Sequence, residues 1–268
     1  MIRIPGRRPR AGWEGWDEYA PFYDWENART VGRRDVRFWR DLAGRVGGPV
    51  LELGCGTGRV ALPLARACVS LVGIDRSEAM LAGARRRLRR AATRALLVRG
   101  DITSLPFEPA TFPLVIAPYG ILQSLLSDRQ LACALASVAR VVRPDGLFGV
   151  DLVADVPRWQ EYQHRITLRG RRGPRGLPVA LVESVRQDPR RKLTIFDQEY
   201  IEGSGRARHA TRFSVAFRTL SVPAMTKRLE RAGFQIDALL GDYNGRPWDP
   251  RADTWLILAR RDGDKVTR

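Results

Sequence analysis

Short apolar runs recur along the first half of the chain, and each is followed within two residues by glycine, proline or an acidic residue. The runs cover residues 50–53, 69–74, 95–98 and 112–117, and another begins after Gly146. Runs of roughly four to eight apolar residues between turn residues are typical of buried parallel strands. The segment between the second and third runs has helical spacing, with an apolar face of Met80, Leu81, Ala84 and Leu88. This alternation predicts an α/β fold with a parallel sheet.

The rest of the chain departs from that alternation. Residues 13–46 carry aromatic and apolar side chains at helical spacing and predict helices that precede the sheet. Residues 157–220 are rich in β-branched and aromatic residues and predict a small antiparallel insertion, in which Gly203, Ser204 and Gly205 form a hairpin turn. Residues 222–232 predict a helix that ends at Gly233, followed by two last strands over 234–240 and 254–259.

We therefore expect a single domain over residues 13–261. Its parts are an N-terminal helical cap (13–46), a core that binds a cofactor (50–153), a β-rich insertion that binds substrate (157–220) and a final helix with two strands (222–261). Residues 1–12 and 262–268 are expected to be tails, the first of them basic and disordered.

The first apolar run ends in a glycine-rich turn. The segment Glu52-Leu53-Gly54-Cys55-Gly56-Thr57-Gly58 has glycine at every second position and leads into a helix expected near Arg59. Glycine tolerates positive φ angles and leaves room for a ligand beside the backbone. Doubly wound folds bind ligands at such turns, so the loop predicts a cradle for an adenosine-containing cofactor. The spacing differs from the G-x-G-x-x-G pattern of dinucleotide sites.

Acidic residues follow the next two runs. Asp75 ends the second run, where its carboxylate can accept hydrogen bonds from both hydroxyls of a ribose, although a helix N-cap or a surface carboxylate would give the same pattern. Asp101 follows the third run, where it either contacts the cofactor or forms a turn after Gly100.

These motifs together resemble the class I S-adenosylmethionine-dependent methyltransferases. The glycine loop matches the first motif of the family, Gly73-Ile74-Asp75-Arg76-Ser77 with Met80-Leu81 matches the second, and Arg143-Pro144-Asp145-Gly146 matches the turn before the fifth strand. Tyr19-Ala20-Pro21-Phe22-Tyr23-Asp24 and the C-terminal Gly241-Asp242-Tyr243 are similar to segments of bacterial small-molecule members, including amino-sugar N-methyltransferases. The resemblance implies a Rossmann-like, doubly wound sheet of seven strands with the last strand antiparallel.

The resemblance also implies the cofactor and its contacts. S-adenosyl-L-methionine is the expected cofactor, with Asp75 on the ribose, Met80 on the adenine ring, Asp101 on the adenine amino group, and the two tyrosines over the methionine end. An aromatic stripe that packs on the sheet is the alternative for those tyrosines. The full set of expected cofactor residues is Tyr19, Tyr23, Glu52, Gly54, Gly56, Gly58, Asp75, Arg76, Met80, Asp101, Ile102 and Pro118.

No general base stands out. Methyl transfer needs one only where the acceptor must lose a proton before it attacks. Tyr23, Tyr119 and His209 are the candidate catalytic residues, and Asp151 is a further candidate by position; Ser124 stands where relatives often carry a histidine. The pattern therefore supports cofactor binding better than any named base.

Net charge and cysteine content change this picture little. The formal net charge is +17, yet only three of the 46 basic residues are lysine (Lys192, Lys227 and Lys265), a skew that codon bias produces without a functional cause. No aromatic residues interleave with the arginine runs as they do in many sites for single-stranded nucleic acid. The three cysteines are scattered without metal-ligand spacing, so we expect no metal and a reduced, cytoplasmic location. No apolar segment follows the basic N-terminus, so no secretory signal is expected.

The leading hypothesis is an enzyme that transfers a methyl group from S-adenosylmethionine to N or O of a small-molecule acceptor. An RNA methyltransferase that uses the arginine-rich surface is one alternative, and a non-catalytic cofactor-binding protein is another. No membrane partner is expected, and the oligomeric state is open.

Overall fold

The computed structural model describes residues 14–30, 34–67, 69–153, 161–252 and 254–263. The chain forms two compact units, which are described separately: residues 1–32 with 156–219, and residues 33–155 with 220–268. The two N-terminal helices fall into different units. The expected tail over residues 1–12 lies outside the described residues, as does most of the C-terminal tail.

The second unit is built on a seven-stranded sheet with the order β10-β11-β5-β4-β1-β2-β3. The strands that bear the motifs are β1 (Val50–Leu53), β2 (Leu71–Asp75), β3 (Leu96–Arg99) and β4 (Phe112–Ala117), and all pair in parallel. β5 (Val142–Val153) pairs in parallel with β4, whereas β11 (Thr254–Arg261) is antiparallel to both β5 and β10 (Phe234–Leu240). The predicted Rossmann-like sheet with an antiparallel last strand is confirmed.

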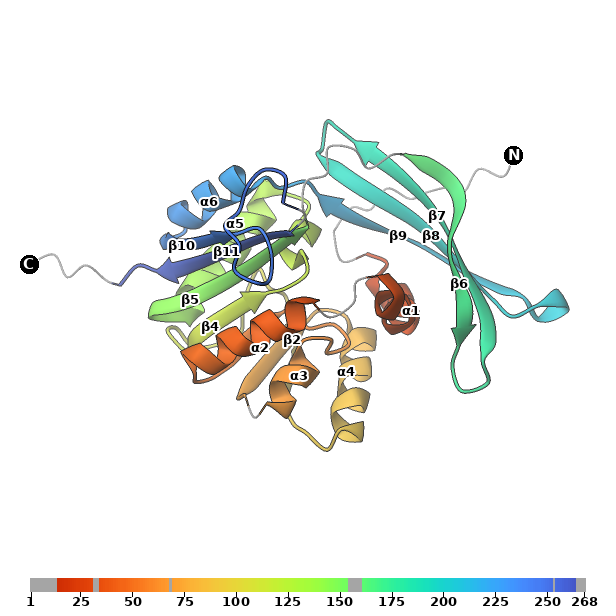
Figure 1. Ribbon diagram of the computed structural model, residues 1–268, viewed down its shortest axis with the longest axis horizontal. Helices are drawn as coiled ribbons and strands as arrows, with labels where there is room; N and C mark the ends of the chain where they lie inside the picture. The colour runs from red at the N-terminus through yellow and green to blue at the C-terminus, as the bar shows by residue number, and fades with distance from the viewer. Residues whose placement is uncertain (1–13, 31–33, 68, 154–160, 253, 264–268) are drawn as a thin grey trace, which may run out of the picture. The chain divides into compact units, whose positions relative to one another are not determined.

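Helices cover both faces of this sheet (Figure 1). α2 (Arg34–Val46) and α3 (Ala61–Arg66) share a core with one face, and α4 (Glu78–Arg90) packs against α3, β2 and β3. α5 (Asp128–Val141) and α6 (Val222–Arg231) share a larger core with the opposite face. β1 supplies both cores by simple alternation, since Val50 belongs to one and Leu51 and Leu53 to the other.

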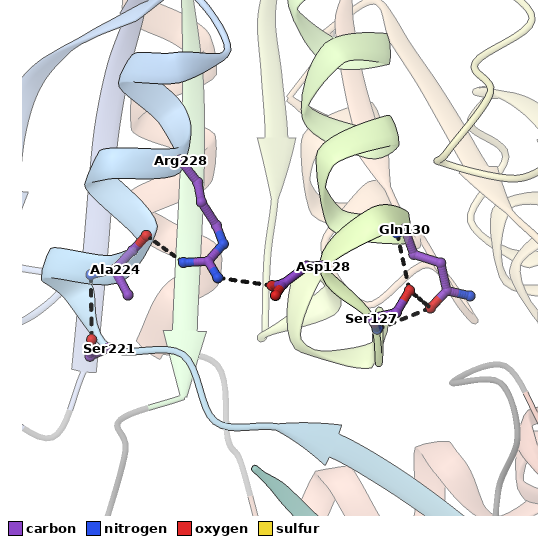
Figure 2. A network of polar contacts seen from close by, with 6 residues as sticks. All are labelled: Ser127, Asp128, Gln130, Ser221, Ala224 and Arg228. Carbon is purple, nitrogen blue, oxygen red and sulfur yellow. Dashed lines mark hydrogen bonds and ion pairs between the residues drawn. The ribbon is translucent and has the colours of Figure 1, made fainter. Parts of the chain in front are cut away.

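Serine side chains set where α5 and α6 begin (Figure 2). Ser127 forms a capping box with Gln130, and the Ser221 hydroxyl accepts from the Ala224 amide at 3.4 Å. Arg228 of α6 donates to Asp128 at the start of α5, across 2.8 Å, and to the carbonyl of Ala224. The acidic side chain therefore lies where the dipole of α5 favours negative charge, and the ion pair joins the two helices.

The turn over residues 143–146, which the sequence analysis placed before the fifth strand, lies within β5 in the structure. Phe112 of β4 pairs with Val142, but the next pair is Leu114 with Leu147, so residues 143–146 bulge out of the ladder. Asp145 adopts a left-handed φ of 61° within this bulge. The regular part of the strand then carries Asp151 in the sheet interior, where it is 3% exposed.

The first unit is a four-stranded antiparallel sheet with the order β6-β7-β8-β9 and the helix α1 (Trp16–Thr30). The strands are β6 (Tyr162–Arg172), β7 (Leu177–Asp188), β8 (Leu193–Glu202) and β9 (His209–Arg218). The predicted antiparallel insertion is confirmed. The β8–β9 connection is longer than a tight turn, because a short 3₁₀ helix, η2 (Gly205–Ala207), extends it.

The helix α1 lies against one face of this sheet (Figure 1). The Phe22 ring stacks on Tyr200 of β8 at 4.0 Å between centroids, and Tyr200 stacks in turn on Phe213 of β9. The Trp25 indole donates to the backbone carbonyl of Arg171 in β6 at 3.1 Å. An aromatic layer therefore fixes the helix to the sheet.

Two glycines test the packing of the second unit. A methyl group at Gly149 of β5 would lie 2.7 Å from the fully buried Trp39 ring, whereas one at Gly44 of α2 would meet nothing within 4 Å. We expect Gly149→Ala to lower the free energy of unfolding by about 1–3 kcal/mol because the core is overpacked. Gly44→Ala should raise it by about 0.5–1 kcal/mol, because a helical glycine loses backbone entropy on folding. Urea unfolding of both variants measures the difference, and equal stabilities would contradict this packing.

Candidate functional site

The carboxyl ends of β1, β2, β3 and β4 meet at one edge of the sheet because these strands are parallel. The glycine loop follows β1, Asp75 ends β2, Asp101 follows β3, and Pro118 with Tyr119 follows β4. The fold thus gathers the expected cofactor residues of the second unit at the edge where open α/β sheets bind ligands.

The glycine loop has left-handed backbone at all three glycines, with φ of 61° at Gly54, 52° at Gly56 and 80° at Gly58. A methyl group at Gly54 would clash with Ile121 at 2.4 Å, and one at Gly58 would touch Ala84 at 3.4 Å, so these two glycines make room for the protein itself. A methyl group at Gly56 would find its nearest neighbour 4.0 Å away, in the backbone of the loop. Gly56 is therefore the position where the loop faces open space.

Asp75 joins the glycine loop to the second strand. One carboxylate oxygen accepts from the Gly56 amide at 2.8 Å, and the other accepts from the Ser77 amide at 2.9 Å. These two bonds fix the orientation of the Asp75 carboxylate at the end of β2. Ser77 caps α4 by accepting from the Met80 amide at 3.1 Å. The Met80 side chain is buried.

The third strand ends in a surface pair. Asp101 accepts from the Thr103 amide and hydroxyl and from Arg76 at 2.7 Å. Its side chain is 38% exposed and that of Arg76 is 50% exposed, while Ile102 beside them is buried. Asp101 thus forms the turn expected as the alternative to a cofactor contact, and its contact with a cofactor stays a prediction.

Glu52 is the buried acid of the site. It is 3% exposed, and its Oε2 atom has no hydrogen-bond partner among the described residues. Burial raises the pKa of the Glu52 carboxyl to about 8; Asp35 and Asp75 add to the rise, and the Arg59 guanidinium opposes it. An unpartnered acceptor at this depth favours a ligand that donates hydrogen bonds.

A second set of contacts lies beside Glu52. Arg59 makes a bidentate ion pair with Asp35, at 2.7 and 2.6 Å, and both side chains are nearly buried. The same guanidinium lies 5.1 Å from the ring centroid of Tyr119. Tyr119 is 37% exposed and has a left-handed φ of 58°. Non-glycine residues held in this conformation often mark functional sites.

Asp151 supports this strained residue from β5. Its carboxylate accepts from the Tyr119 backbone amide and from the Tyr243 hydroxyl, the latter at 2.6 Å. Burial raises the pKa of the Asp151 carboxyl to about 6, and the two hydrogen bonds oppose the rise. Burial, with the Asp151 charge, raises the pKa of the Tyr243 hydroxyl well above its usual value.

The remaining sequence candidates lie in the first unit. Tyr19 is 7% exposed and donates its hydroxyl to Glu26 at 2.8 Å, and Tyr23 is half-buried with its ring 5.4 Å from that of Tyr19. His209 is the exposed first residue of β9. The structure therefore brings Glu52, the three glycines, Asp75 and Pro118 together in one unit. Tyr19, Tyr23 and His209 lie in the other unit, and their expected roles stay predictions.

Sequence reasoning missed Asp35, Arg59 and Tyr243 as site residues. Asp35 lies on a helix and Arg59 in a turn, and only the folded chain brings them together. Tyr243 was noted only because its segment is similar to one in bacterial small-molecule methyltransferases, and its bond to Asp151 could not be foreseen. Among the described residues, no cluster of three or more histidine, cysteine, aspartate or glutamate side chains is arranged to hold a metal ion.

Comparisons with known proteins cover the part of the chain that carries this site. Residues 50–146 match the model of a family described as a methyltransferase domain. Over these residues the chain is similar to methyltransferase domains. These residues contain the glycine loop, Asp75 and Asp101, together with the strands β1 to β4.

Three similar proteins show how far the likeness extends. The 2-phytyl-1,4-naphtoquinone methyltransferase of Synechococcus elongatus is 33% identical over 141 residues, which cover 48% of this chain and 58% of that protein. The CcbJ methyltransferase of Streptomyces caelestis has a TM-score of 0.76 at 21% identity over 94% of this chain and 99% of its own. CalS10 of Micromonospora echinaspora, an amino pentose methyltransferase solved with S-adenosylmethionine bound, has a TM-score of 0.66 at 19% identity, with coverage of 89% and 95%.

The two structural likenesses establish the fold over nearly the whole chain. By sequence, the chain spans about half the length of the curated relatives it matches. In the part of the chain that the structure describes, no helix combines the length and the apolar character needed to cross a bilayer.

The first prediction for this site concerns the buried ion pair between Asp35 and Arg59. We expect Asp35→Ala to lower the free energy of unfolding by about 3 kcal/mol or more, because it leaves Arg59 charged and nearly buried without its partner. Asp41→Ala is the matched control, since Asp41 lies on the same helix in exposed pairs with Arg37 and Arg40 and its loss should have no measurable effect. Urea unfolding measures both, and a small loss in Asp35→Ala would show that the pair contributes little.

Proposed function

We propose that this protein transfers a methyl group from S-adenosylmethionine to a nitrogen or oxygen atom of a small-molecule acceptor. One observation carries the proposal: the glycine loop opens to free space at Gly56, and the strand that leads into this loop carries Glu52, a buried acid with an unpartnered carboxylate oxygen. The methyltransferase domain over residues 50–146 contains both features.

The residues at this edge suit the parts of the cofactor. The methionine end of the cofactor carries an ammonium group. This group could donate a hydrogen bond to the unpartnered Glu52 oxygen and place a positive charge beside the carboxylate. Asp75 is proposed to accept from the ribose hydroxyls, in addition to the two amides that already fix its orientation. Met80 and Ile102 would lie beside the adenine, Asp101 would accept from its amino group, and Arg76 and Pro118 would border the site.

S-adenosylmethionine supplies a methyl group that its sulfonium already activates. The contribution of the protein is then to align the acceptor and to exclude water, and positioning of this kind can lower a barrier by roughly 7–11 kcal/mol. A base is needed for a hydroxyl acceptor but not for a neutral amine. Of the candidate bases Tyr23, Tyr119 and His209, Tyr119 alone belongs to the unit that carries the glycine loop.

Tyr119 is proposed to act at the acceptor end of the site. Its ring is exposed, the Arg59 guanidinium lies against it, and Asp151 holds its backbone in the left-handed conformation. The hydroxyl of Tyr119 is therefore the group proposed to accept a proton from a hydroxyl acceptor.

The small-molecule acceptor is supported by the extent of the structural likeness. CcbJ and the amino pentose methyltransferase CalS10 match about nine tenths of this chain, which includes the four-stranded sheet as well as the methyltransferase domain. An amine or hydroxyl of a small molecule, such as a sugar, is therefore the favoured acceptor.

Transfer of a radiolabelled methyl group from S-adenosylmethionine into a cell extract tests the proposal. The extract is separated into small-molecule and RNA fractions after incubation with the protein. Label in the small-molecule fraction is the expected result and supplies a compound to identify. Label that ribonuclease releases from RNA would replace the proposal with an RNA methyltransferase, and cofactor binding without label in any fraction would indicate a non-catalytic protein.

The ribose contact gives a second prediction. Asp75→Ala should weaken the binding of S-adenosylmethionine by about 2 kcal/mol, or roughly 30-fold, because it removes charge-assisted hydrogen bonds to the hydroxyls and frees the Gly56 amide. Glu78→Ala is the control, since Glu78 is also acidic and close in sequence but pairs with Arg85 at the surface. Calorimetric titration measures both constants. Unchanged affinity in Asp75→Ala would remove Asp75 from the site.

The raised pKa of Glu52 predicts how cofactor affinity depends on pH. The carboxyl must be ionised to pair with an ammonium group, and a pKa of about 8 leaves it mostly protonated at neutral pH in the free protein. Binding must then release a proton, so the affinity should fall as the pH is lowered, by roughly tenfold from about pH 9 to about pH 7.

Glu52→Gln separates this effect from titration of the cofactor itself. The variant cannot ionise at this position. Its affinity for S-adenosylmethionine should be weaker, and it should not show the roughly tenfold fall between about pH 9 and about pH 7 that protonation of Glu52 causes. The same pH profile in the variant and in the unchanged protein would show that Glu52 does not face the ammonium group.

A further inference from the structure

The first unit contains two carboxylates on the layer between α1 and its sheet. Glu183 of β7 lies directly opposite Gln198 of β8, and Leu181 lies opposite Tyr200, so these four side chains share one face. Tyr200 stacks on Phe22 of α1, which identifies that face as the one that α1 covers. Glu26 of α1 accepts a hydrogen bond from the Tyr200 hydroxyl and therefore points into the same layer.

Neither carboxylate has a positive partner among the described residues. Both hydroxyls that reach Glu26, from Tyr19 and Tyr200, bind its Oε2 atom. Glu183 accepts from the Tyr162 hydroxyl through one oxygen and from the Gln198 amide through the other, at 2.8 Å. All of these donors are neutral, so two negative charges share a largely buried layer.

The nearby arginines are engaged elsewhere. Arg172 pairs with Glu202 and lies over the Phe22 ring, and Arg165 lies 5.7 Å from the centroid of the Tyr162 ring. Burial raises the pKa of the Glu26 carboxyl, and the charge of Glu183 raises it further, against the two tyrosine hydrogen bonds. Among the residues that the structure describes, none supplies a compensating cation to Glu26.

Gln198 gives independent evidence that a donor is missing. It is 6% exposed, its amide nitrogen donates to Glu183, and its Oε1 atom is buried with no hydrogen-bond partner. An amide oxygen and two carboxylates are all acceptors. A group that donates to the Gln198 oxygen and also brings positive charge to the two carboxylates would complete this set, and an ammonium group has both properties.

We propose that Glu26, Glu183 and Gln198 form a binding site for the ammonium group of a small organic amine. Glu26 and Tyr162, whose hydroxyl contacts Glu183, are half-buried, so the proposed site reaches solvent at its edge. That this amine is the methyl acceptor rests on the proposed function, whereas the binding itself does not.

A comparison of glucosamine with glucose tests this site. The two sugars differ only in an ammonium group in place of a hydroxyl, and titration calorimetry of the whole protein needs neither cofactor nor methyl transfer. We expect glucosamine to bind at least about tenfold more tightly than glucose. Glu183→Gln, which keeps the shape and removes the charge, should abolish most of that preference, and Glu26→Gln should reduce it from the more exposed side of the site.

Glu199→Gln is the matched control. Glu199 follows Gln198 directly in β8, points to the opposite face and pairs with Arg212 at 2.5 Å, so its loss should leave the preference for glucosamine unchanged. Thermal unfolding of each variant confirms that it folds. Because Glu183→Gln removes one of two uncompensated charges, its melting temperature should not fall.

Absence of a preference for glucosamine, including failure of both sugars to bind, would overturn the proposal. A preference that persists in both Glu183→Gln and Glu26→Gln would overturn it as well. If the preference is present and lost as expected but no methyl group is transferred to any amine, the ammonium site stands and the proposed function fails.

Discussion

The hydrogen bond from the Gly56 amide to the Asp75 carboxylate connects the parts on which the second unit depends. It fixes the glycine loop after β1 to the end of β2 and requires the left-handed backbone that only glycine adopts readily. The second oxygen of the same carboxylate accepts from Ser77, which caps the next helix. One side chain thus orients the loop, the strand end and the helix start around the place where Gly56 faces open space.

Buried charge is the second constraint, and the two units meet it differently. In the second unit Arg59 neutralises Asp35 and Tyr243 donates to Asp151, but Glu52 keeps an unpartnered oxygen. In the first unit tyrosines and a glutamine surround Glu26 and Glu183 without a cation. Buried acceptors without partners reduce stability, so their presence in both units is best understood if each serves a positively charged ligand group.

The local parts of the fold could be predicted from the sequence. The run Val50–Leu53, the helix with the apolar face of Met80 and Leu88 and the stop at Gly233 depend on neighbours within a few residues, and each was placed correctly. The antiparallel insertion was also predicted, because β-branched residues dominate it. The contacts that tune the site could not be, since Asp35 and Arg59 are 24 positions apart and Glu26 and Tyr200 are 174 positions apart. Such pairs carry no local pattern and follow only from the packing of whole elements.

The most direct test of the account is the affinity of S-adenosylmethionine for Gly56→Val beside Gly47→Val. Both glycines have positive φ, and a Cβ at either meets no atom closer than 4.0 Å, so both variants carry similar backbone strain. Only Gly56 belongs to the loop that is proposed to hold the cofactor. The account predicts that Gly56→Val loses cofactor binding while it stays folded, and that Gly47→Val binds as the unchanged protein does. Normal binding by a folded Gly56→Val would show that the cofactor lies elsewhere.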